Sequence, residues 1–220
     1  FLLCEYSHAM GNSCGGLADY VALEDQFTHY QGGFLWDYID QALQTVLPSG
    51  DMGLGYGGDF FDQPTDRHFC GNGLVFANRA VTPKMQEVRY LYQNVRILPD
   101  VRGVTLENRN LFDALTAYRL RWRLDRDGEP IASGALEAIS VPPGERRAFP
   151  LPLPPMHAPG EYALRCELCW KNPMPWAEAD TPQMHGQAVL AAVPGKRVAP
   201  TPEPYHIALG DCNVGAAANE

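Results

Sequence analysis

The residues with the clearest chemical potential come within the first thirteen positions. The apolar run Phe1–Cys4 leads directly into Glu5, and His8 follows three residues later, before a Gly-Asn pair. Because no polar residue alternates with the apolar ones, we expect Phe1–Cys4 to be a strand buried on both faces. An acid at the carboxyl end of such a strand has the position of an active-site residue in a β/α barrel. An ordinary acid at the start of a loop fits this stretch equally well.

The segment after this acid has the pattern of a βαβ unit. Apolar and aromatic side chains recur at helical spacing over residues 13–30, and Gly32-Gly33 ends the pattern. A second apolar strand is expected over Phe34–Ile39. Strand, helix and strand predict two parallel strands joined by a right-handed crossover.

A long loop and a further helix follow. Residues 40–73 are rich in Gly and Asp and show no pattern of regular structure, but they contain several aromatic residues, which favours an ordered, functional loop. Thr82-Pro83 predicts the start of a helix over about residues 83–93. Two βα units of a larger barrel are therefore expected, and two units cannot close a barrel.

The composition changes near residue 95. Residues 1–93 hold 11 Asp and Glu, 4 Lys and Arg and 3 Pro, whereas residues 94–220 hold 15, 13 and 16. Proline disfavours long helices, so we expect a β-rich second part and place a domain boundary at Asn94–Asp100. The spacing of its strands suggests an antiparallel sandwich. The predicted strands lie at 104–108, 119–124, 131–133, 148–151 and 162–170.

Three features of this part have more than one interpretation. Arg119, Arg121 and Arg123 alternate with apolar residues, and this row is either a ligand surface or, as we favour, a solvated strand face. Cys166 and Cys169 have redox-motif spacing, but residues three apart on a strand point to opposite faces, so we expect reduced, structural thiols. Pro-rich residues 200–204 predict a linker, and the segment from His206 predicts the start of another strand.

Composition also restricts the function. A net charge of −9 argues against a nucleic-acid partner, and no apolar run is long enough to span a membrane. No signal peptide is evident, and reduced cysteines favour the cytoplasm. The chain opens in mid-strand without an initiator Met, which predicts a fragment of a longer polypeptide.

Four motifs occur in chain order: Glu5-Tyr-Ser-His-Ala-Met-Gly-Asn-Ser13, Gln31-Gly-Gly-Phe-Leu-Trp-Asp-Tyr-Ile-Asp-Gln41, Tyr56-Gly-Gly-Asp-Phe60 and Phe69-Cys-Gly-Asn-Gly-Leu-Val-Phe-Ala77. With these motifs the chain resembles the large bacterial β-galactosidases of glycoside hydrolase family 2. The match is dense over residues 1–93 and weaker over 94–200. The resemblance implies a multidomain fold, in which the last two βα units of a (β/α)8 TIM barrel form residues 1–94. An immunoglobulin-like antiparallel β-sandwich would follow over 95–200, and 201–220 would be a linker and the start of a truncated β-domain.

The resemblance implies a retaining glycosidase that acts on terminal β-D-galactosides such as lactose. Glu5 falls on the nucleophile position, His8 on a residue that binds sugar hydroxyls and supports the transition state, and Trp36 on an aromatic wall for galactose. Such an enzyme forms a covalent glycosyl-enzyme and needs a second carboxylic acid to protonate the leaving oxygen. Without the motifs, a structural His and a core Trp are the plainer interpretations of two of these residues.

The resemblance also implies metal ions. Phe69, through its backbone carbonyl, and Asn72, through its side-chain oxygen, match a Na⁺ site that touches the sugar, and hard cations take oxygen ligands. Seen alone, the Asn-Gly pair is more typical of a turn. In this family Asp37 and Asp40 have no catalytic role, so we interpret them as structural.

In this family the acid/base Glu and most ligands of the catalytic Mg²⁺ lie upstream of the matched segment. We therefore expect the chain to be inactive alone, within a parent that is commonly a homotetramer. Two alternatives stay open. The first places the parent with the family 2 glucuronidases or mannosidases, and the second makes the chain a non-catalytic carbohydrate-binding or scaffold module.

Overall fold

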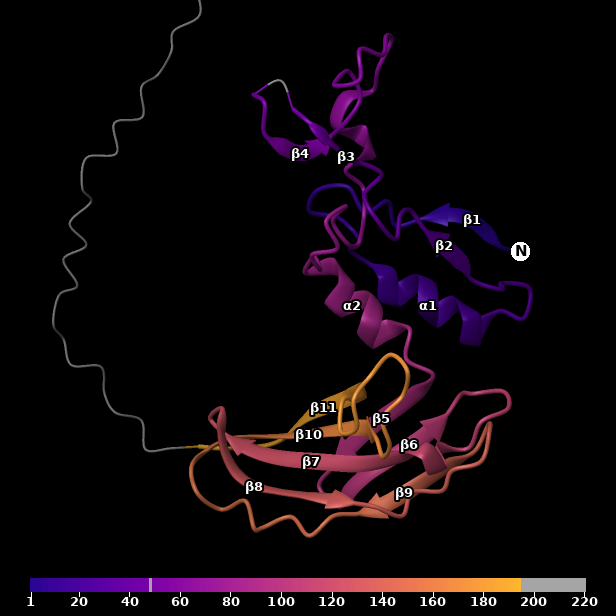
Figure 1. The fold of residues 1–220 in the computed structure, drawn as a ribbon. Helices are drawn as coiled ribbons and strands as arrows, with labels where there is room; N and C mark the ends of the chain where they lie inside the picture. Colours follow the sequence, from indigo (N-terminus) through magenta and orange to yellow (C-terminus); the bar gives the residue numbers. More distant parts are fainter. Residues whose placement is uncertain (48, 195–220) are drawn as a thin grey trace, which may run out of the picture.

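The computed structural model describes residues 1–47 and 49–194, which form a mixed α/β part followed by a β-rich part (Figure 1). The predicted linker at 200–204 and the predicted strand from His206 lie outside the described residues. Helices α1 (Leu17–Gln26) and α2 (Lys84–Leu91) have 10 and 8 residues, and no helix in 1–47 and 49–194 has the length and apolar character to cross a membrane.

The first part begins with the predicted parallel pair. Strand β1 (Leu3–Tyr6) pairs with β2 (Gly33–Leu35), and helix α1 (Leu17–Gln26) connects them. Leu3 lies opposite Gly33 and Tyr6 opposite Leu35, so the two strands end side by side. No sheet formed by the described residues closes into a barrel.

The predicted helix over residues 13–30 was too long at both ends. Gly16 has a φ of +71°, a left-handed conformation outside the helical region, so α1 begins only at Leu17. The helix ends at Gln26, because Phe27 takes an extended conformation. Strand β2 is also shorter than the predicted Phe34–Ile39, since Ile39 forms only an isolated bridge with Val75.

The expectation that Phe1–Cys4 is buried on both faces was wrong. Phe1 is 75% exposed and Leu2 is 53% exposed, and Phe34 on the neighbouring strand is 61% exposed. The reason is that β2 is the one strand paired with β1 in the described chain. Only the inner face of this pair is covered, where Tyr6 packs in a small core with five residues of the loops and helices: Ala9, Cys14, Leu17, Leu74 and Val88.

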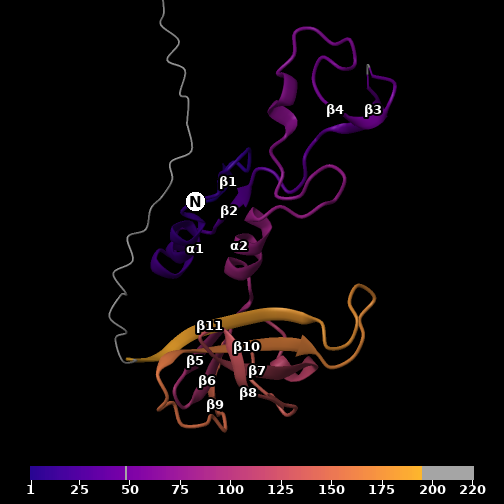
Figure 2. The same cartoon turned by 90° about the vertical axis from the view of Figure 1, so that its left-hand side faces the viewer.

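The prediction of an irregular loop over residues 40–73 was also wrong in part. An antiparallel hairpin, β3 (Leu43–Val46) and β4 (Met52–Gly55), occupies its first half, and a 3-10 turn, η1 (Arg67–Cys70), lies near its end. The hairpin projects from the rest of the molecule (Figures 1 and 2). Most of its apolar residues are exposed, so neither period-2 burial nor a buried run was available to predict it.

The predicted helix exists as α2 (Lys84–Leu91), which starts one residue later and ends two residues earlier than the predicted 83–93, with Pro83 just before its first residue. The Thr82 hydroxyl does not cap the helix. It donates instead to the backbone oxygen of Leu74, 2.7 Å away, which joins the start of α2 to the Asn72–Leu74 segment.

The second part consists of two antiparallel sheets. One has the order β11-β10-β7-β8 and the other β5-β6-β9. Apolar side chains from both sheets form one core that includes Leu106, Trp122 and Leu164. The strands are β5 (Val95–Asp100), β6 (Gly103–Asn108), β7 (Tyr118–Arg126), β8 (Glu129–Leu136), β9 (Arg146–Pro150), β10 (Gly160–Trp170) and β11 (Pro182–Val193), with a 3-10 turn η2 (Leu115–Ala117) before β7.

All five predicted strands of this part exist, and β5 and β11 were not predicted. Each arginine of the β7 row has an acidic partner at ion-pair distance: Arg119 with Asp180 at 3.1 Å, Arg121 with Glu167 at 3.1 Å and Arg123 with Asp125 at 2.8 Å. This pairing favours the solvated strand face over a ligand surface. Cys166 and Cys169 are free and buried, and only Cys166 belongs to the shared core.

The two parts meet where β11 passes beneath α2 (Figure 2). The Gln93 side chain donates to the backbone oxygen of His185 at 3.1 Å and accepts from its amide at 2.5 Å. Asp25 of α1 pairs with both Arg96 and Arg109 of the β-rich part. These contacts fix the helices against the sheet.

Candidate functional site

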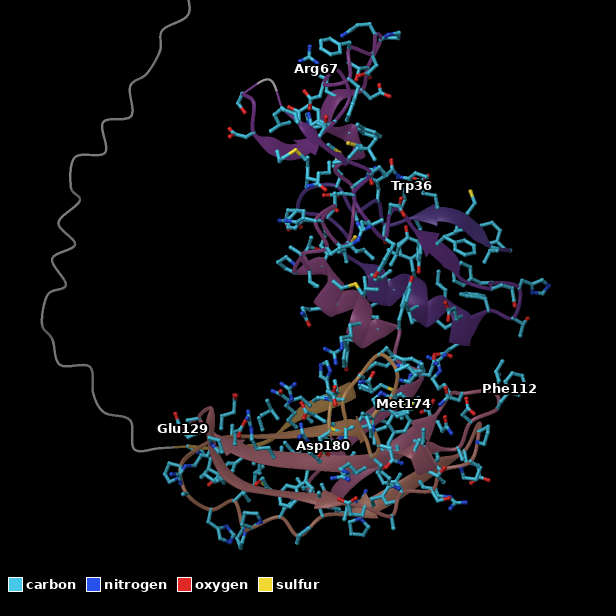
Figure 3. The ribbon with its side chains drawn as sticks, viewed as in Figure 1. Trp36, Arg67, Phe112, Glu129, Met174 and Asp180 are labelled. Carbon is cyan, nitrogen blue, oxygen red and sulfur yellow. The ribbon has the colours of Figure 1, made fainter. Side chains whose placement is uncertain are left out.

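The candidate site lies at the carboxyl ends of β1 and β2. Glu5 is the third residue of β1 and is exposed, and Trp36 directly follows β2. Trp36 lies between the strand pair and the projecting hairpin, and its side chain is 40% exposed (Figure 3). Because the strands are parallel and in register at Tyr6 and Leu35, both residues reach the same end of the sheet.

The backbone after Glu5 turns sharply and is held by Trp36. Ser7 has a φ of +47°, and the chain reverses there. The amide of Trp36 donates to the Tyr6 carbonyl at 3.3 Å, and the Ala9 amide donates to the Trp36 carbonyl at 2.6 Å. His8 therefore lies between two residues that are both tied to the end of β2.

The η1 turn brings a third segment to this turn. The rings of His8 and Phe69 lie 5.5 Å apart between centroids, at an interplanar angle of 35°. His8 is half-buried and Phe69 is 54% exposed. The structure thus brings together two of the predicted residues that are far apart in the chain.

Asn72 is the buried polar residue of the site, with 2% of its surface exposed. Its Nδ2 donates to the Phe69 carbonyl at 3.0 Å, and its backbone carbonyl accepts from the Asp37 amide at 2.9 Å. Its Oδ1 is buried and has no hydrogen-bond partner. A buried acceptor without a donor is costly, and a cation at this point would satisfy it.

Two aspartates brace this part of the site through hydrogen bonds. Asp37 accepts from the Tyr38 amide at 2.6 Å and from the Gln41 side chain at 2.9 Å. Asp40 accepts from the Gly73 amide at 2.6 Å. A Cβ at Gly73 would collide with the backbone of Asp40, so glycine is required there. These contacts agree with the structural role predicted for both acids.

A cavity of about 390 Å³ connects three of the predicted residues, Trp36, Phe69 and Asn72. Residues of the long loop complete its wall, among them Asp62 and Arg67, which sequence reasoning missed. Backbone amides, that of Gly58 first, hold the pKa of Asp62 below its ordinary value, so this wall carries a carboxylate. No spacing signal marks these two residues, because the loop alone brings them to the cavity.

Tyr6 links the strand end to α2. Its hydroxyl forms a hydrogen bond with that of Tyr92, and burial together with this bond raises the pKa of Tyr6 far above its ordinary value. Tyr6 is therefore a neutral packing residue of the site rather than an acid or base.

The donor atoms of the site decide which metal ions it could hold. Within the described parts of the chain, no three side chains among His, Cys, Asp and Glu gather to hold a metal ion. The oxygens of Phe69 and Asn72 are a different donor set, of the kind that hard cations prefer over transition metals.

Comparison with protein families gives two matches in chain order. Residues 1–97 match the family model "Glycosyl hydrolases family 2, TIM barrel domain". Residues 104–191 match the model "Beta-galactosidase, domain 4". The two matches adjoin in the segment that joins the α/β part to the β-rich part.

Curated proteins named β-galactosidase are similar to this chain over nearly its whole length. A β-galactosidase of Clostridium acetobutylicum is 44% identical over 215 residues, which are 98% of this chain and 24% of that protein. One from Streptococcus thermophilus is 41% identical over 217 residues, or 98% of this chain and 21% of that protein. The β-galactosidase BgaC of Bifidobacterium adolescentis is 42% identical over 194 residues, or 87% of this chain and 18% of that protein. The chain thus spans less than a quarter of the length of these relatives.

Proposed function

We propose, from the premise that this chain belongs to the glycosyl hydrolases of family 2, that it supplies the nucleophile and part of the sugar-binding surface of a retaining β-galactosidase. One observation carries the proposal. An exposed carboxylate, Glu5, and an exposed indole, Trp36, lie at the ends of neighbouring parallel strands, beside a His–Phe pair and a buried Asn. The relatives that match nearly the whole chain are named β-galactosidases.

The chemistry follows from a retaining mechanism. The Glu5 carboxylate attacks the anomeric carbon as the bond to the leaving oxygen breaks, and a second carboxylic acid gives that oxygen its proton. A covalent galactosyl-Glu5 ester forms. Water, which loses a proton to the same second carboxylate, then attacks the anomeric carbon and releases Glu5 and the sugar.

Three neighbours would bind the sugar. The half-exposed Trp36 ring offers an apolar face for the C–H side of galactose. His8, held by the backbone on both sides and by contact with Phe69, would hydrogen-bond a sugar hydroxyl and stabilise the transition state. Asn72 lines the adjoining cavity of about 390 Å³, which has the dimensions of a small-ligand site.

A sodium ion fits the residues present, whereas magnesium does not. The Phe69 carbonyl and Asn72 Oδ1 would hold Na⁺, because Oδ1 is buried without a donor. A 180° turn of the Asn72 side-chain amide would exchange its nitrogen, which now donates to the Phe69 carbonyl, for Oδ1 and so bring the two oxygens together. Bound there, Na⁺ would supply positive charge beside the sugar. No group suited to Mg²⁺ occurs in the described residues, and no step is assigned to that ion.

We further propose how the chain divides into domains. Residues 1–94 are the last two βα units of a TIM barrel, 95–200 an immunoglobulin-like sandwich, and 201–220 a linker and the start of another β-domain. The two antiparallel sheets around one core support the second assignment. A homotetramer in the cytoplasm is the corresponding assembly, and the free cysteines of the described chain are in keeping with a reducing compartment.

Covalent trapping tests the proposal. The β-galactosidase that contains this segment is incubated with 2-deoxy-2-fluorogalactosyl fluoride, which slows release of the glycosyl-enzyme, and labelled peptides are identified by mass spectrometry. We expect the label on Glu5 and no label in Glu5→Gln. A label on another residue, or turnover of a nitrophenyl galactoside by Glu5→Gln at the wild-type rate, would overturn it.

Two further measurements address the remaining alternatives. A panel of nitrophenyl glycosides should show hydrolysis of the galactoside well above that of the glucuronide and the mannoside. The 220-residue chain alone should be inactive, because a retaining mechanism needs two carboxyl groups and Glu5 is the one carboxylate that β1 and β2 carry to their ends in the described residues. Turnover by this chain would contradict that expectation. Glycan binding unaffected by Glu5→Gln would instead favour a non-catalytic module.

A further inference from the structure

A lysine side chain ties the turn that follows Glu5 to the start of helix α2. The Nζ of Lys84 donates to the backbone carbonyl of Ala9 at 2.5 Å and to that of Gly11 at 3.0 Å. Lys84 is 75 residues from Ala9 in the chain, so this contact is a product of the fold.

Helix energetics alone do not explain a lysine at this position. Lys84 is the first residue of α2, and Pro83 before it offers no side-chain cap. The amino end of a helix carries partial positive charge, so an ammonium group there is unfavourable. The two carbonyl acceptors offset that cost, because hydrogen bonds from a charged donor are stronger than neutral ones.

The hydrogen bond from Lys84 acts on Ala9, the residue that directly follows His8. Ala9 is fully buried, and its amide donates to the Trp36 carbonyl at 2.6 Å. Its carbonyl is the one that Lys84 binds. Ala9 is thus anchored on one side to the end of β2 and on the other to α2, and His8 directly precedes it.

We propose that Lys84 is a positioning residue, which acts through Ala9 and Gly11 to hold the Glu5–His8 turn in its productive geometry. The catalytic consequence rests on the proposed function, whereas the structural consequence does not. Without the ammonium group, the Ala9 carbonyl loses its charged donor, and the turn loses this anchor to α2, so that it moves more freely.

The structural test is amide hydrogen exchange in the complete 220-residue chain. Lys84→Met keeps the length and apolar stem of the side chain and removes its donors. We expect the Ala9 amide and its neighbours to exchange about tenfold faster, with the amides of α2 and the β-sheets unchanged. Lys84→Arg should restore slow exchange. Lys171→Met is the matched control, because Lys171 also donates to a backbone carbonyl, that of Thr116 at 2.8 Å, far from this turn.

The catalytic test uses the whole β-galactosidase. Lys84→Met should lower kcat about tenfold with KM changed less than twofold, and Lys84→Arg should recover most of kcat. Unchanged exchange at Ala9, equal acceleration throughout the chain, or failure of Lys84→Arg to restore the turn would overturn the proposal. A wild-type protein without galactosidase activity would refute the proposed function, and the exchange data would still decide the role of Lys84.

Discussion

Asn108 offers a direct measure of what a buried amide contributes to the β-rich part. The side chain is 1% exposed at the end of β6. Its Nδ2 donates to the carbonyls of Val141 at 2.9 Å and Asp113 at 2.8 Å. Its Oδ1 accepts from the amide and the side chain of Asn110, at 3.0 and 2.8 Å. We predict that Asn108→Ala destabilises the chain substantially.

The expected size follows from these contacts. The two Nδ2 bonds to backbone carbonyls are at least partly shielded from water, and each contributes about 1 to 1.5 kcal/mol. The Asn110 contacts contribute less, about 0.5 kcal/mol together, because water can replace a partner that is only half-buried. The free energy of unfolding should therefore fall by about 3 kcal/mol, a large share of a typical total.

Urea denaturation of the 220-residue chain measures this change. With a slope of about 2 kcal/mol per molar urea, the midpoint should fall by about 1.5 M at unchanged slope. Asn110→Ala is the control and should cost less than about 1 kcal/mol. A loss below about 1 kcal/mol for Asn108→Ala, or equal losses for the two variants, would refute the assignment of the stabilisation to the Nδ2 bonds.

Two further predictions concern titratable groups. Burial raises the pKa of the Cys166 thiol to about 12. Iodoacetamide at pH 8 should therefore label the exposed Cys4 in the native chain and should label Cys166 only in urea. Labelling of Cys166 in the native chain would disprove its burial. Burial raises the pKa of Glu167, but the hydrogen bond from Arg121 and the charge and hydrogen bond of Arg165 outweigh it, so the pKa lies below its ordinary 4.5. The stabilisation by Glu167 is present above that value and is lost as pH falls through the lowered pKa. Wild type should thus lose more unfolding free energy than Glu167→Gln between pH 5 and acid unfolding, and parallel losses would contradict the ion pair.

Much of the architecture was predictable because it depends on local patterns. The apolar run Phe1–Cys4 predicted a strand that leads into an acid, and Gly11 and Asn12 predicted a break in the pattern after it. Alternation of polar and apolar residues predicted β7 and β10, since a strand with one buried face requires it. Motif order alone singled out Glu5 and Trp36 among the many Asp, Glu and Trp residues as candidates for a site.

Only the tertiary structure decided how these pieces meet. The contact of His8 with Phe69 and the bond from Lys84 to Ala9 join residues that are 61 and 75 positions apart in the chain. The burial of Asn72 likewise results from packing. Local preference acts over a few residues, whereas such contacts depend on how strands, helices and loops pack. The same reason explains the errors. The left-handed backbone of Gly16 made α1 shorter than predicted. The hairpin at Leu43–Gly55 exposes most of its apolar residues, so its sequence lacks the alternation that would predict its strands.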